Sequence, residues 1–274
     1  MLHCSHTRLS VTLLPRVVTL GVTGGIASGK SVRCSHVLKL AQSRARHPLH
    51  SFAAHSINAD KIGHDIYAPG KPCYYEVIAA FGKNVLEQSE KRRQNGGERA
   101  EPPIDRKKLG AIVFHTPRSA ELRRLSDICW PHIQNAIEEE IEKVSVLALS
   151  DKKNLLLIIL EAALLIESNM LSLCDDVWVT TCDKGVAVRR VMARHRVQQR
   201  EAIARVEAQP NIEEKIKFLE DVKFKGEVVT FDTTEDTVEE GLRRVTVAFD
   251  TYWRKKLDAL QKDPNAEAAS LNME

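Results

Sequence analysis

The sequence VVTLGVTGGIASGKS, residues 17–31, contains the pattern G-x-x-x-x-G-K-S. Glycines in this pattern let the backbone turn successive N–H groups inward, which forms a nest for an anion at a helix N-terminus. The lysine ammonium can reach the β- and γ-phosphates of a nucleotide, and the serine hydroxyl can ligate Mg²⁺. We therefore expect a P-loop that binds the phosphates of ATP through Gly24, Gly25, Ile26, Ala27, Ser28, Gly29, Lys30 and Ser31.

The residues on each side of this loop favour the same interpretation. Val17–Val22 is an apolar run typical of a buried strand, and Lys30–Ser43 reads as a helix. A glycine-rich turn without a ligand is the alternative. Because GTPases, motor ATPases, kinases and adaptor proteins all use this loop, it predicts nucleotide binding without fixing the reaction.

Short apolar runs alternate with amphipathic helical stretches along the chain, as in βαβ units around a parallel sheet. We expect strands at Val17–Val22, Ser51–Ile57, Asn154–Leu160, Asp176–Thr181 and Glu227–Phe231. Helices are expected at Lys30–Ser43, Tyr74–Phe81, Arg106–Phe114, Ser119–Val144, Lys184–His195, Arg200–Ala208 and Glu235–Leu260. The predicted fold class is α/β, a three-layer P-loop NTPase fold with a parallel sheet. A chain of 274 residues, 43% of them hydrophobic, can bury the core of one such domain with an inserted subdomain.

The two ends and one internal segment depart from this alternation. We place an N-terminal extension at residues 1–15, the P-loop domain at 16–260 and a polar tail at 261–274. Residues 87–103 are charged and have no apolar period, so we expect a surface loop or insertion there. The extension is basic and free of acids, which faintly resembles an organelle transit peptide. We expect a cytoplasmic protein, with mitochondrial import as the alternative.

The composition disfavours several classes of partner. A net charge of +3 and few aromatic residues give little reason to expect nucleic-acid binding or a nucleic-acid-dependent ATPase. The six cysteines show no metal-binding spacing, which indicates reduced thiols rather than a zinc site. The most apolar run, Leu155–Ile166, is too short to cross a bilayer, so we expect no membrane partner. The sequence does not fix an oligomeric state, and we expect a monomer.

Carboxylates are expected beside the loop, because phosphoryl transfer to a hydroxyl needs charge neutralisation and a group that orients the acceptor. Asp60 follows the strand at Ser51–Ile57, and we interpret it as that orienting group. The N-cap of a helix at Lys61–Tyr67 is the alternative role for Asp60. Glu161 closes the most apolar strand, where it either coordinates Mg²⁺ or only supports the loop. We interpret Glu167 as structural.

Arginines are dense between Lys184 and Gln209. On a helix, Arg190 and Arg194 lie four residues apart and share one face. Kinases with a P-loop close a lid whose guanidinium groups bind the γ-phosphate in the transition state. We interpret residues 184–209 as such a lid, with Arg194 and Arg205 as catalytic candidates, and a solvated charged helix as the alternative.

Taken together, these residues resemble the dephospho-CoA kinase family over about residues 17–253, nearly the whole chain. The resemblance is carried by several elements in the same order: LGVTGGIASGKS at 20–31, NADKIGHDIYAPGKP at 58–72, AAFGKNVL at 79–86, IDRKKLGAIVF at 104–114, EAALLIE at 161–167, RRVMAR at 189–194 and ARVEAQ at 204–209. Such an ordered series is far more specific than the P-loop alone.

The resemblance implies that ATP phosphorylates the ribose 3′-hydroxyl of dephospho-CoA, with Mg²⁺ as cofactor. It implies a helical acceptor-binding portion at about 74–144, in which Asp105 and Arg106 help to hold dephospho-CoA. It also assigns Asp60 as the base, Lys30 to the phosphates, and Ser31 with Glu161 to the metal.

Several positions depart from the family pattern, among them Trp130-Pro131 in place of the usual His-Pro and a longer segment at 87–103. Asn58 replaces the first aspartate of an Asp-Ala-Asp segment, and Glu161 replaces an aspartate. The Asn-Gly turn near the adenine is absent from VVTFDTTED at 228–236, so the base contacts stay unassigned. Two further functions stay open: another small-acceptor kinase, for a nucleotide, nucleoside or metabolite, and a non-catalytic ATP-binding protein.

Overall fold

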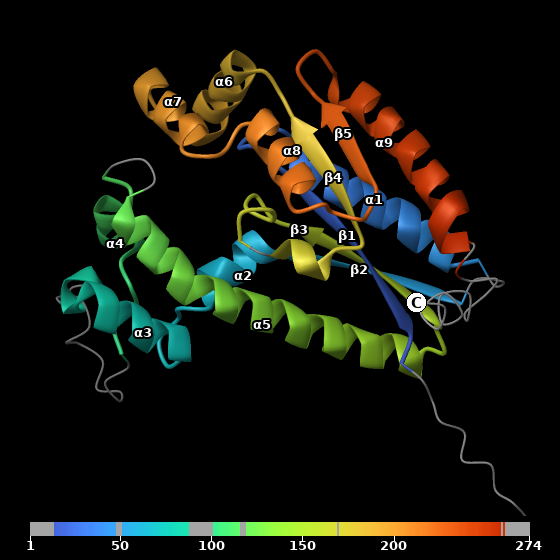
Figure 1. Cartoon of the computed structure of the whole chain (residues 1–274), viewed down its shortest axis with the longest axis horizontal. Coiled ribbons are helices and arrows are strands. Elements are labelled where there is room, and N and C mark those ends of the chain that lie inside the picture. The colour runs from blue at the N-terminus through green and yellow to red at the C-terminus, as the bar shows by residue number, and fades with distance from the viewer. Residues whose placement is uncertain are drawn as a thin grey trace, which may run out of the picture.

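A computed structural model describes residues 14–47, 51–87, 101–115, 119–168, 170–258 and 260. Over these ranges the chain forms a five-stranded sheet in the order β2-β3-β1-β4-β5, in which every pair of neighbours is parallel (Figure 1). The strands are β1 (Arg16–Gly24), β2 (Phe52–Asn58), β3 (Leu155–Glu161), β4 (Asp176–Thr181) and β5 (Val228–Asp232). All five predicted strands are confirmed, and so is the α/β fold class.

The middle strands are buried because helices cover both faces of the sheet. On β3, Leu155, Leu157 and Ile159 pack with the helices α1 (Lys30–Ala45) and α9 (Val238–Tyr252). The alternate residues Leu156, Ile158 and Leu160 pack with α5 (Ala120–Ser150) and α8 (Ile212–Asp221) on the other face. A strand buried on both faces reads as a continuous apolar run, and LLLIIL is such a run. The result is the three-layer arrangement seen in Figure 1.

The remaining helices are α2 (Ala59–Asp65), α3 (Pro72–Phe81), α4 (Arg106–Val113), α6 (Lys184–His195) and α7 (Gln199–Glu207). Helix α5 continues six residues beyond the predicted end at Val144, and α9 begins at Val238 rather than Glu235. The later start of α9 follows from a capping box between Thr237 and Glu240. A π-helical turn, Trp253–Leu257, extends α9.

Helix α8 is absent from the predicted elements. It begins at a capping box in which the Asn211 side chain accepts from the Glu214 N–H and the Glu214 carboxylate accepts from the Asn211 N–H. This N-x-x-E signal is readable in the sequence. Residues 212–221 lie beyond the predicted lid at 184–209, and no element is predicted there.

Helices α3 and α4 and the first half of α5 surround a hydrophobic cluster of their own, which includes Tyr74, Val77, Leu109 and Cys129. In Figure 1 these helices lie beyond the β2 side of the sheet. Helices α6 and α7 form a second small cluster through Val188, Val191 and Ala202, and Ile26 and Ala27 of the P-loop pack against it. The predicted lid segment therefore rests directly on the P-loop.

Several predictions from the sequence lie outside the described residues. Most of the extension predicted at 1–15 (residues 1–13), most of the insertion predicted at 87–103 (residues 88–100) and all of the polar tail at 261–274 lie there. The domain boundaries therefore stay predictions. Among the described residues, none of the helices combines the length and the apolar character needed to cross a membrane.

Replacement of Asn211 by alanine removes the side-chain cap of α8, the hydrogen bond that the Asn211 side-chain oxygen accepts from the Glu214 N–H. We expect Asn211→Ala to lower the free energy of unfolding by about 1 kcal/mol and Tm by about 2–4 °C, measured by calorimetry. Lys217→Ala, on the exposed side of the same helix, is the control and should leave Tm within about 1 °C of the wild type. Equal Tm values for the two variants would contradict the prediction that the Asn211 cap stabilises the protein.

Candidate active site

The P-loop connects the end of β1 to the start of α1, and two of its glycines are required by geometry. Gly24 has φ 147°, and a Cβ there would lie 2.1 Å from the Thr180 carbonyl oxygen. Gly29, the N-cap of α1, has φ 85°. The loop thereby presents its backbone at the N-terminus of α1, as the sequence predicts.

Lys30 is folded back onto the loop. Its ammonium donates to the carbonyl oxygens of Gly24, at 2.8 Å, and Gly25, at 3.0 Å. Burial lowers the pKa of Lys30, while the nearby carboxylates of Asp60 and Glu161 act in the opposite direction. Lys30 therefore lies within the electrostatic reach of both predicted carboxylates.

Ser28 and Thr180 join the P-loop to the end of β4. The two hydroxyl oxygens are 2.6 Å apart, and the Ser28 hydroxyl also donates to the Gly25 carbonyl. Thr180 was missed by the sequence analysis. The available signal was its place at the carboxyl end of a predicted strand beside the loop.

Glu161 lies at the end of β3, in register with Val22 on β1 and Asn58 on β2. Its side chain is buried, and Ser31 donates to one carboxylate oxygen at 2.5 Å. Asn58 donates through its side-chain amide to the other oxygen at 3.0 Å. The structure thus brings together Ser31 and Glu161, the two predicted metal ligands.

Asn58 also caps α2, since its side-chain oxygen accepts from the Lys61 N–H at 2.9 Å. The alternative role for Asp60 as the N-cap of a helix at Lys61–Tyr67 is therefore wrong. Helix α2 begins two residues earlier, at Ala59, because Asn58 supplies the cap. An amide at position 58 can donate to Glu161, whereas a carboxylate there would repel it.

Asp60 lies in the first turn of α2 and is exposed. One carboxylate oxygen accepts a hydrogen bond from the Ala163 N–H at 3.3 Å, just after β3 ends. Asp60 and Glu161 therefore follow neighbouring strands at the same edge of the sheet, and Asp60 faces solvent where an acceptor could approach.

The lid arginines differ in what they contact. Arg190 donates to the Thr233 hydroxyl at 2.9 Å, to the Thr233 carbonyl at 2.7 Å and to the P-loop carbonyl of Ala27 at 3.3 Å. Arg194 is exposed one turn further along α6. Arg205 is exposed on α7 and pairs with Glu201 at 2.6 Å. Among these three, only Arg190 joins the lid to the P-loop, and the roles of Arg194 and Arg205 stay predictions.

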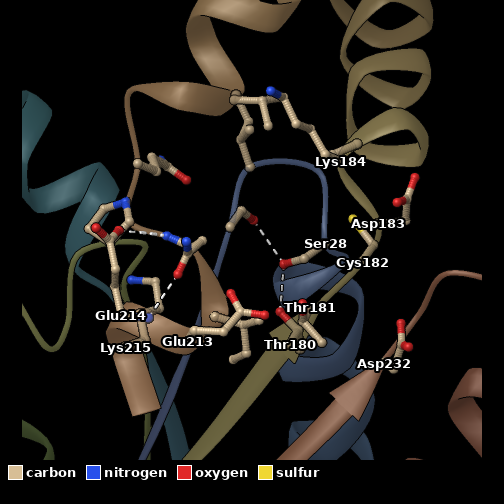
Figure 2. A pocket seen from close by; sticks show the side chains of 18 of the residues that line it. Ser28, Thr180, Thr181, Cys182, Asp183, Lys184, Glu213, Glu214, Lys215 and Asp232 are labelled. Atoms are coloured by element: carbon tan, nitrogen blue, oxygen red, sulfur yellow. Dashed lines mark hydrogen bonds between the residues drawn. The ribbon is translucent and has the colours of Figure 1, made fainter. Parts of the chain in front are cut away.

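A cavity of about 740 Å³ lies over the P-loop. Figure 2 shows Ser28 near its centre, with Thr180, Thr181, Asp183 and Asp232 toward one side. Glu213, Glu214 and Lys215 of α8 form the opposite side. The cavity therefore spans the carboxyl ends of β4 and β5, the lid and α8.

Asp105 and Arg106 line a second cavity, of about 760 Å³. One oxygen of Asp105 caps α4 by accepting from the N–H groups of Lys107 and Lys108. Arg106 donates to the His64 carbonyl at 2.7 Å, and its guanidinium lies over the Tyr67 ring. Arg106 thus ties the start of α4 to the end of α2, the helix that carries Asp60.

Substitution at Gly24 should distort the loop. We expect Gly24→Ala to lower Tm by at least about 4 °C, because a Cβ cannot fit against the Thr180 backbone. Gly25→Ala is the matched control, since a Cβ there meets nothing within 4 Å. Thermal unfolding without nucleotide compares the two, and an unchanged Tm for Gly24→Ala would contradict the geometry.

Comparison with known proteins identifies the family. The sequence model of dephospho-CoA kinase matches residues 18–225. The dephospho-CoA kinase of Carboxydothermus hydrogenoformans is 36% identical over 64% of this chain and 70% of its own, and that of Moorella thermoacetica is 32% identical over 65% and 69%. A Thermus thermophilus crystal structure has the same fold, with a TM-score of 0.57 at 22% identity over 88% of this chain and 98% of its own. The chain belongs to the dephospho-CoA kinase family.

Proposed function

We propose that this protein transfers the γ-phosphoryl group of ATP to the ribose 3′-hydroxyl of dephospho-CoA and releases coenzyme A and ADP. The main observation behind this proposal is that three features lie together at one edge of the sheet: the P-loop, the Ser31–Glu161 pair and the exposed Asp60. Family membership supports the choice of acceptor.

On the donor side, residues Gly24–Ser31 would hold the phosphates of ATP. Lys30 can exchange the Gly24 and Gly25 carbonyls for phosphate oxygens without leaving the loop. The Ser31 hydroxyl and the Glu161 carboxylate, 2.5 Å apart, are the hard oxygen ligands that suit Mg²⁺. Bound there, Mg²⁺ would neutralise the charge on the phosphate oxygens. One carboxylate with a hydroxyl is enough, because Mg²⁺ in kinases takes its other ligands from phosphates and water.

On the acceptor side, Asp60 would orient the 3′-hydroxyl and accept its proton as the new O–P bond forms. The Ala163 N–H holds one oxygen of Asp60, which leaves the other oxygen toward solvent for this task. Asp105 and Arg106, in the second cavity, would help to hold the rest of the acceptor.

Arg194 and Arg205 would bind the γ-phosphate when the lid closes. Arg205 must first leave Glu201, and exposed i,i+4 pairs of this kind contribute only about 0.3–0.5 kcal/mol. The pair is therefore a weak obstacle to closure. A monomeric state, location in the cytoplasm and the absence of a nucleic-acid partner stay predictions.

The most direct experiment is an assay coupled to ADP release, with ATP, Mg²⁺ and dephospho-CoA. We expect turnover with dephospho-CoA and, for Asp60→Ala, a fall in kcat of about 10²- to 10⁴-fold with ATP affinity retained. A screen of nucleotides, nucleosides and other small acceptors should give weaker turnover. No product from dephospho-CoA beside good turnover of another acceptor would overturn the proposed substrate. No turnover of any acceptor beside retained ATP binding would indicate a non-catalytic protein.

The metal assignment predicts a change in Mg²⁺ dependence. Glu161→Gln removes the charge but keeps the size of the side chain, so we expect half-maximal activity at about 10-fold higher Mg²⁺, measured by titration at saturating ATP. Glu142→Gln, on an exposed face of α5, is the control and should titrate as the wild type does. An unchanged Mg²⁺ titration for Glu161→Gln would leave Glu161 only a structural role.

A further inference from the structure

Lys215 on α8 is a buried cation next to the phosphate site. Its side chain is 2% exposed, and its ammonium has two partners, a Glu167 carboxylate oxygen at 2.5 Å and the Ala163 carbonyl oxygen at 3.2 Å. The other Glu167 oxygen is buried without a hydrogen-bond partner among the described residues. Burial of an ion pair has a large desolvation cost, so we expect this pair to add little to the free energy of unfolding.

The backbone of Ala163 connects Lys215 to Asp60. Its carbonyl oxygen accepts from Lys215 and from the Thr23 hydroxyl, each at 3.2 Å, and its N–H donates to the Asp60 carboxylate at 3.3 Å. The carbonyl and the N–H of Ala163 belong to two successive planar peptide groups that meet at its Cα, so an anchor on the carbonyl oxygen restricts where the N–H can point. Lys215 therefore helps to hold the residue that bonds Asp60.

The position of Lys215 also relates it to the donor site. The residue lines the cavity above the P-loop, on the side opposite Thr180 and Asp183 (Figure 2). Its charge is close enough to Lys30 to lower the pKa of that lysine. Helix α8 follows the lid helix α7, with only Ala208–Asn211 between them. Lys215 thus lies close to the lid, to the phosphate site and to the residues that hold Asp60.

We propose that Lys215 is a positioning residue for the phosphoryl transfer: anchored by Glu167, it fixes the backbone of Ala163, whose N–H holds the Asp60 carboxylate in place for the acceptor hydroxyl. This inference rests on the proposed function. Lys215 works through Ala163 and Asp60 and does not touch the substrate. Because misplacement by about 1 Å can cost about 10²-fold in rate, loss of this anchor should reduce kcat while the ground-state binding of ATP is kept.

The test compares Lys215→Met with the wild type in the dephospho-CoA assay. We expect kcat to fall about 10- to 100-fold, with KM and Kd for ATP changed less than about 3-fold. Lys217→Met, two residues along the same helix and exposed, is the matched control and should keep the wild-type kcat. An inactive wild type would refute the proposed function, whereas an active wild type with full activity in Lys215→Met would refute the positioning role alone.

A double-mutant cycle with Asp60→Asn tests whether Lys215 affects kcat through Asp60 or independently of it. If Lys215 acts through Asp60, adding Lys215→Met to Asp60→Asn should reduce kcat by less than about 3-fold further. If the kcat losses of the two single variants multiply in the double variant, the proposal is overturned. A large rise in the Kd for ATP in Lys215→Met would also overturn it, because that result would indicate direct contact between Lys215 and phosphate. Single-turnover assays with labelled ATP give enough sensitivity for the slow variants.

Loss of Lys215 alone leaves Glu167 unpaired and could unfold the protein. The double substitution Lys215→Met with Glu167→Met removes both charges, and replacement of a buried ion pair by apolar residues is often neutral or stabilising. We expect this variant to have a Tm near that of the wild type but a kcat as low as that of Lys215→Met. A stable double variant with the wild-type kcat would show that the pair serves the fold only.

Discussion

The active site depends on the carboxylate of Glu161, which lies at the end of β3 and connects Ser31, after the neighbouring strand β1, with Asn58, at the end of the neighbouring strand β2. Parallel register places Val22, Asn58 and Glu161 in one row across β1, β2 and β3. From the end of β3, Glu161 bonds to Ser31 of the P-loop helix and to Asn58 before α2. A buried carboxylate needs such partners, so the donor and acceptor sides of the site are held in one arrangement.

This arrangement links two of the departures from the family pattern, Asn58 and Glu161. At position 58 an amide donates to Glu161 and at the same time caps α2, whereas an aspartate would place two carboxylates in contact. With Asn58 as the cap, Asp60 falls in the first turn of α2 and turns its carboxylate toward Ala163 and solvent. The departures thus leave the predicted orienting group exposed at the edge of the sheet.

The parts of the fold that the sequence predicts are those with strong local signals. Apolar strands and the glycine pattern of the P-loop follow from rules about backbone conformation and burial. Helix α8 also has a local signal, the Asn211–Glu214 capping box, but it is absent from the predicted elements. The contacts of Arg190 with Thr233 and of Lys215 with Ala163 join residues 43 and 52 positions apart. Sequence periodicity carries no information about such contacts, because they depend on how whole elements pack.

The central claim is that this site delivers a phosphoryl group to the ribose 3′-oxygen of dephospho-CoA. The position of the new phosphate can be read directly from the purified product by phosphorus and proton NMR. We predict a phosphomonoester coupled to the ribose H3′, with transfer dependent on ATP. A phosphate on any other atom, or dephospho-CoA recovered unchanged after incubation with the folded, ATP-bound protein, would contradict this account.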